Sequence, residues 1–123
     1  MNWYLAKIIF GICLNENKQI TQFDEQLRII SARNENEAFL KARMIGVREE
    51  DSFVNEKHRP VKWEFIDVAE LSLVSELKDG IELYSCIHER EEAEGYVHYV
   101  QQKASSIEGR IQQLSTLTLQ KFA

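Results

Sequence analysis

Three histidines and two cysteines are the side chains of this 123-residue sequence with the greatest capacity for chemistry. His88 opens a charged run in which a zinc-binding helix would need a second histidine four residues later, but that position holds Glu92. His58 and His98 do not stand at metal-ligand spacing from His88 either. The sequence therefore predicts no metal-binding residues.

The usual signatures of nucleophilic catalysis and phosphate binding are also missing from the sequence. Cys13 and Cys86 fall inside apolar segments that we predict to be strand interiors, where a thiol is inert. No serine stands in a Gly-x-Ser-x-Gly elbow, and the five glycines are too far apart to form a phosphate-binding loop. We therefore expect no catalytic residues and no cofactor.

Two tryptophans and two titratable side chains offer one alternative, a small-molecule binder or enzyme with a cleft near the sheet. Its residues would be Trp3, Trp63, Glu64 and His88. Strict alternation around Trp63 instead favours a buried tryptophan with Glu64 on the opposite face of its strand. A deep pocket with converging polar groups would support the alternative.

The composition describes one acidic domain with a single core. Hydrophobic residues make up 44% of the chain and the formal net charge is −5, a balance that argues against a nucleic-acid surface. Ten Asp or Glu and only five Lys or Arg lie within residues 47–88. An electrostatically attracted partner would therefore be a basic protein that meets this middle third.

Compartment and membrane association follow from the cysteines and the hydropathy. The two cysteines lack the pairing of a disulfide framework, so we expect the reducing cytoplasm. The apolar run at residues 8–14 is too short and too poorly flanked for a signal peptide, and we interpret it as a strand. No stretch approaches the ~18 apolar residues of a membrane span, so we expect no membrane partner.

Periodicity predicts the elements that would position these side chains. Residues 3–14 are nearly all apolar, as in a central strand, and after a polar turn at 15–19 the segment 23–30 returns as its hairpin partner. Asn34 with Glu37 three residues later predicts the start of an amphipathic helix that ends at Gly46.

A second group of strands follows this helix. Residues 61–65 alternate strictly, and a change of phase at residues 66–68 predicts a bulge. Asp79-Gly80 predicts a hairpin turn with a return strand at 81–87. The expected fold is α+β: an antiparallel β-sheet in β-β-α-β-β order covered by one helix, in a domain spanning residues 1–88.

Three groups of residues resemble a known family. They are Trp3-Tyr4-x-Ala6-Lys7, the Phe23-to-Ala32 strand leading into Glu35-x-Glu37-Ala38 and Lys41-Ala42, and Trp63-Glu64-Phe65-x-x-Val68. Over about residues 3–88 this pattern resembles the bacterial family catalogued as domain of unknown function 4288. The resemblance implies a compact bacterial α+β domain and carries over no catalytic residues.

Residues 89–123 form a predicted helical extension of the same structural unit, with a helix from about Glu89 to Leu114. Apolar side chains recur at alternating spacings of three and four, the pattern of helices that pack along a seam. The candidate interface residues are Val97, Val100, Ala104, Ile107, Ile111 and Leu114. We expect a homodimer through this helix; the alternative is that the helix folds back across its own sheet. Thr116 to Gln120 alternates like a short strand.

The function that these observations favour is a small non-enzymatic protein-interaction module. The acidic middle third and the small size also suit an immunity protein that neutralises a basic toxin. The small-molecule binder or enzyme described above is the third hypothesis.

Overall fold

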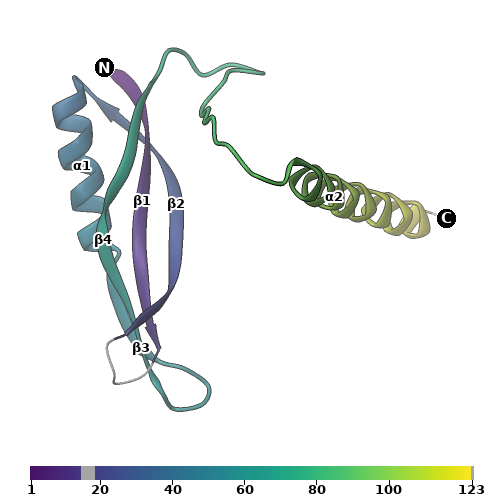
Figure 1. Ribbon diagram of the computed structural model, residues 1–123, viewed down its shortest axis with the longest axis horizontal. Coiled ribbons are helices and arrows are strands. Elements are labelled where there is room, and N and C mark those ends of the chain that lie inside the picture. Colours follow the sequence, from purple (N-terminus) through teal and green to yellow (C-terminus); the bar gives the residue numbers. More distant parts are fainter. Residues whose placement is uncertain (15–18, 123) are drawn as a thin grey trace. The chain divides into compact units, whose positions relative to one another are not determined.

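The computed structural model describes residues 1–14 and 19–122, and the side chains of all of these except 118 and 120–122 (Figure 1). Its elements are β1 (Asn2–Leu14), β2 (Ile20–Ala32), α1 (Glu35–Arg48), β3 (Asp51–Val54), β4 (Pro60–Val74) and α2 (Ala93–Phe122). They form two compact units, Met1–Ser85 and Cys86–Ala123. The polar turn predicted at 15–19 lies largely outside the described residues.

The first unit is a four-stranded antiparallel sheet in the order β2-β1-β4-β3, with α1 on one face. The predicted α+β class, with a sheet covered by one helix and a long C-terminal helix, is confirmed. β1 occupies a central position in the sheet, and its 13 residues are almost continuously apolar. The order leaves β2 and β3 at the two edges of the sheet.

The core lies between α1 and one face of the sheet. Even-numbered residues of β1 point toward α1, and Ile8 and Phe10 among them are completely buried. Ile45 of α1 packs against the core, and beside it the buried residues of the helix are all small, namely Ala38, Ala42 and Gly46. Because these residues lack bulk, α1 can sit close to β1 and β4.

The start of α1 is the one that the sequence predicts. The Asn34 side chain accepts a hydrogen bond from the backbone N–H of Glu37 at 2.8 Å, which satisfies one of the unpaired donors of the first turn. The end of α1 differs from the prediction, because the helix continues through Gly46 to Arg48. Gly46 instead faces the ring of Phe65 on β4, which an added side-chain carbon would overlap.

The predicted bulge in β4 is confirmed and is double. Lys7 pairs with Glu70 but Ile8 with Val68, and Ile9 pairs with Asp67 but Phe10 with Phe65. Each shift leaves one extra residue on β4, first Ala69 and then Ile66. The two extra residues keep the apolar side chains of β4 on the α1 face. Trp63, Phe65, Val68 and Leu71 all pack against the core.

The hairpin predicted at Asp79-Gly80 is wrong. A turn does form there, with Gly80 at a φ of 83° and the N–H of Ile81 donating to the carbonyl of Lys78. However, residues 75–78 and 81–92 are irregular, so the turn has no strand on either side to pair. As a result Cys86, predicted inside a strand, is an exposed thiol, whereas Cys13 is buried in β1 as expected.

Two other predicted boundaries need correction. The segment 116–120, predicted as a strand, belongs to α2. Its alternating threonines and leucines are also compatible with a helix, and the continuous helix before them extends through them. The helix itself begins at Ala93 and not at Glu89, so Glu94 is the acidic residue of its first turn.

A charge pair connects the outer side of α1 to the bulged part of β4. Arg43 donates two hydrogen bonds to the carboxylate of Asp67, each of 3.0 Å, in the bidentate geometry that arginine favours. These bonds, followed by the backbone N–H of Val68, hold the pKa of Asp67 below its usual range. The neighbouring turn has a similar pair, in which Arg33 lowers the pKa of Glu37.

Replacing Gly46 with alanine should destabilise the first unit. Alanine is the better helix former by about 1 kcal/mol, but its methyl group would overlap the Phe65 ring, which packs edge-on against Phe10. Overpacking costs about 1–3 kcal/mol, so we expect a net loss of up to about 2 kcal/mol of unfolding free energy, measured by urea denaturation. In a Phe65→Leu background the loss should shrink.

The matched substitution Gly109→Ala, in α2, meets nothing within 4 Å and should raise helix content. Equal losses of stability at both glycines would contradict the close contact between Gly46 and Phe65.

Removing the Arg43 guanidinium should raise the pKa of Asp67. A carboxylate whose pKa is depressed in the folded state contributes stability that is present above its unfolded pKa and lost as pH falls through the folded pKa. The stability difference between wild type and Arg43→Gln should therefore be largest near neutral pH and shrink toward low pH. NMR titration of the Asp67 side chain provides the measurement. Arg33→Gln is the control, and it should move the pKa of Glu37 while leaving that of Asp67 unchanged.

Candidate functional site

The six predicted interface residues all lie on α2, a helix of 30 residues. At 1.5 Å per residue its length is about 45 Å, well beyond the ordinary helix of three or four turns. The larger apolar side chains of the stripe are about half exposed, from 47% for Val100 and Ile107 to 59% for Leu114. The structure thus confirms the helix on which the stripe was predicted.

The stripe falls into two positions of a seven-residue repeat. The first, a, holds Val97, Ala104 and Ile111, and the second, d, holds Val100, Ile107 and Leu114. Both glycines of α2, Gly95 and Gly109, fall at position f on the opposite side of the helix. The seam is therefore continuous, and the glycines weaken helix propensity without interrupting it.

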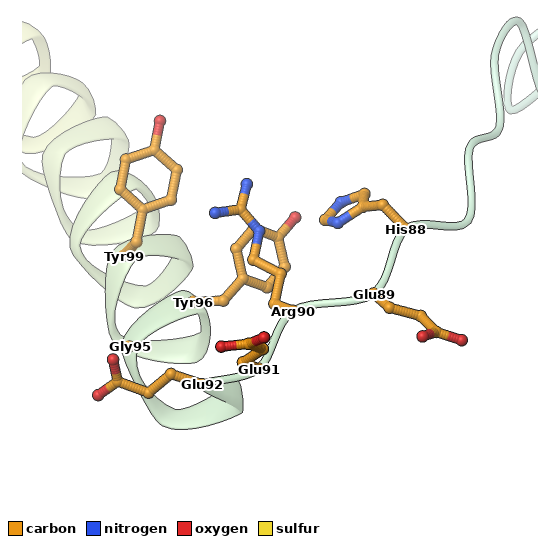
Figure 2. Close-up of a pocket in the computed structure, with 8 residues that line it drawn as sticks. All are labelled: His88, Glu89, Arg90, Glu91, Glu92, Gly95, Tyr96 and Tyr99. Atoms are coloured by element: carbon orange, nitrogen blue, oxygen red, sulfur yellow. The ribbon is translucent and has the colours of Figure 1, made fainter.

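A second feature is an open hollow at the start of α2 (Figure 2). It is lined by His88, Glu89, Arg90, Glu91, Glu92, Gly95, Tyr96 and Tyr99. The Arg90 guanidinium lies over the Tyr96 ring at 4.9 Å, and the His88 ring meets the same ring edge-on at 5.3 Å. Tyr99 stacks beside Tyr96 at 6.4 Å.

The side chains of this hollow are engaged with one another and do not converge on an empty centre. Figure 2 shows the Glu89 carboxylate directed away from the aromatic rings. The arrangement stabilises the first turns of α2 through cation–π and aromatic contacts. Across the described residues, no group of three histidine, cysteine or acidic side chains could hold a metal ion.

Within the first unit, the two tryptophans of the predicted cleft lie on opposite faces of the sheet. Trp63 pairs with Ile12 on the α1 face, as predicted, while Trp3 pairs with Val74 on the opposite face. Glu64 pairs with Gly11 and so points away from the Trp63 face, also as predicted. His88 belongs to the second unit.

Sequence reasoning missed one surface, the outward face of β2. Phe23, Leu27 and Ile29 are 61%, 54% and 46% exposed there. The covered face of the same strand holds polar side chains at Asp24, Gln26 and Arg28. The signal was available in the sequence, since the segment from Phe23 to Ile29 alternates apolar and polar residues. The pairing with β1 was needed to show which set points outward.

Comparison with known proteins bears on the first unit only. A family model described as "Domain of unknown function (DUF4288)" matches residues 3–85, which include every strand and α1. No curated protein and no solved structure matches the chain. Within the described residues, no helix is long and apolar enough to cross a membrane.

Proposed function

The chain belongs to the family described as domain of unknown function (DUF4288), and we propose that it is a non-enzymatic protein-interaction module that forms a homodimer through α2. The observation that carries this proposal is the apolar stripe exposed along α2. Exposed stripes of this kind mark interaction surfaces, because water-accessible apolar area is unfavourable in a free protein. A second copy is the simplest partner, since a two-fold axis buries both stripes at once.

The charges beside the stripe favour a parallel pair of helices. In the seven-residue repeat Lys103 and Arg110 occupy position g, and Glu108 occupies position e. In a parallel pair, g of one helix faces e of the other five residues further on, which places Lys103 opposite Glu108 of the second copy. An antiparallel pair would instead bring g positions together and oppose positive charges.

One end of the seam has the residue types of a two-helix pair. Ile111 is β-branched at position a and Leu114 lies at position d, the combination that favours parallel dimers, whereas Val100 and Ile107 place β-branched residues at position d. Ala104 at the centre of the seam is small and permits close approach of the two backbones.

The basic-partner alternative has less support from the structure. Several carboxylates of the acidic middle third already have partners in the same chain: Glu49 lies 3.8 Å from Arg28, Asp67 is bound by Arg43, and Glu70 lies 3.5 Å from Lys7. These pairs reduce the charge that this region would present to a basic protein.

Charges placed inside the seam should separate the dimer. We expect Ile107→Asp/Ile111→Asp to weaken association by 100-fold or more, because a carboxylate buried without a partner is strongly unfavourable. Ser105→Asp/Gln112→Asp adds the same charges at position b, outside the seam, and should leave the dimer intact. Static light scattering at ~100 µM gives the mass; a wild-type monomer there would mean an affinity weaker than about −5.5 kcal/mol and would refute the proposal.

The same variants distinguish pairing between copies from packing within one chain. Both tryptophans, Trp3 and Trp63, lie in the first unit, so tryptophan fluorescence reports its folding alone. Unfolding of this unit in the Ile107→Asp/Ile111→Asp variant would show that α2 belongs to its own core, the fold-back arrangement. Retained native fluorescence with a monomeric mass is the result we expect.

Helix orientation has its own test. Lys103→Glu should weaken a parallel dimer roughly 5-fold or more at low salt, since two attractive pairs become repulsive. Adding Glu108→Lys should restore the affinity, and both effects should fade as salt increases. Sedimentation equilibrium measures the dissociation constants. A dimer that becomes tighter with Lys103→Glu alone would be antiparallel.

A further inference from the structure

The edge strand β2 has one long side without a neighbouring strand in the described part of the chain. β2 spans 13 residues and pairs only with β1. At one end Lys41 of α1 donates a 2.7 Å hydrogen bond to the backbone carbonyl of Ser31, so that carbonyl is occupied. Such an edge normally carries lysines, a proline or a charged outer face that discourages pairing with another chain.

The side chains along this edge do the opposite. The outward face presents Phe23, Leu27 and Ile29, each about half exposed or more, with Glu25 as its charged residue. The covered face presents a chain of polar contacts: Gln26 donates to Asp24 at 2.5 Å, and Arg28 donates to Gln26 at 2.8 and 3.1 Å. An apolar outer face on a long exposed edge is the signature of a strand that pairs with another strand.

We infer that β2 of one copy pairs antiparallel with β2 of a second copy, with Gln26 opposite Gln26 at the two-fold axis. In this register Asp24 lies opposite Arg28 of the other copy, and Phe23 lies opposite Ile29. Each of these pairs occurs twice. Opposite charges and apolar side chains directly across two strands stabilise the pairing. The contact lies in the sheet unit and is independent of the proposed pairing of α2.

Neighbouring registers are less complementary. Centring the pair on Glu25 or Arg28 places like charges opposite each other. Centring it on Leu27 sets Asp24 against Ile30 and Glu25 against Ile29, whereas the register centred on Gln26 opposes, among the charged residues, only Glu25 to an apolar residue, Leu27, and keeps the Asp24–Arg28 pair. The position of Lys41 points to the same register, because the edge is accessible from the start of β2 to about Ile30 and Gln26 lies near the middle of that stretch.

The backbone geometry also indicates a specific kind of pair at Gln26. Because the Ser31 carbonyl accepts its hydrogen bond from Lys41, we take it to point to the outer edge, and odd-numbered residues of β2 would then direct their backbone groups away from β1. Gln26 is even-numbered, so its backbone bonds to β1 and it would form a non-hydrogen-bonded pair across the axis. The Cα atoms of such a pair are about 4.5 Å apart, a separation that a disulfide can bridge.

Disulfide trapping in the full-length chain tests this contact. All variants carry Cys86→Ser, because Cys86 is exposed and would cross-link on its own, while Cys13 is buried. Gln26→Cys should form a covalent dimer under mild oxidation at least 10-fold faster than the control Gln22→Cys. Position 22 would face position 30 of the other copy, so two copies of residue 22 are about 26 Å apart. Equal rates at the two positions would overturn the inference.

A charge exchange gives an independent measurement. Asp24→Arg and Arg28→Asp each oppose like charges across the two-fold axis and should slow Gln26→Cys trapping about 5-fold, while the double exchange should restore it. No recovery in the double exchange would overturn the register. Failure of the α2 proposal is read separately, by light scattering of the seam variant, so that the two contacts cannot be confused.

Discussion

The distance between α1 and the sheet is the constraint on which the first unit depends. Three small residues at intervals of four, Ala38, Ala42 and Gly46, let the helix backbone approach β1 and β4. Phe65 then fills the space above Gly46 and contacts Phe10 at the centre of the core. The two extra residues in β4 serve the same geometry, because without them Val68, which lies between the two bulges, would fall on the opposite face from Phe65 and Leu71. The position of α1 and the two bulges of β4 therefore both serve the packing of the same core.

Features set by short-range chemistry could be predicted from the sequence. The Asn34 cap, the nearly continuous apolar run of β1 and the change of phase in β4 each follow from residues within a few positions of one another. Features that depend on distant residues could not. Gly46 resembles a helix end, but it is a close contact with a residue 19 positions later. The Asp79-Gly80 turn has the residues of a hairpin, but whether strands form around it depends on a partner that local sequence does not reveal.

The candidate surfaces divide in the same way. The α2 stripe could be found from spacing alone, because a helix of that length displays its own periodicity without reference to other elements. The β2 surface could not, because alternation says that two faces differ and only the pairing with β1 says which one is covered. Phe23 and Arg28 have the reverse of the usual placement, with the aromatic ring outward and the guanidinium on the helix side. Local rules that fail in an otherwise consistent fold commonly mark surfaces with a function.

The segment between the two units limits how the two proposed contacts can be combined. Tyr84 remains tied to the sheet through its contacts with Lys7 and Glu70, so the connection to α2 consists of residues 86–92, which can reach about 25 Å. With both proposed contacts, one chain could make the two contacts to the same neighbour, which closes a pair, or one contact to each of two neighbours, which builds an open chain of copies. A short connection between the units favours the closed pair, because the first contact raises the effective concentration for the second contact to the millimolar range. Lengthening this connection would therefore shift the balance from closed pairs toward open chains.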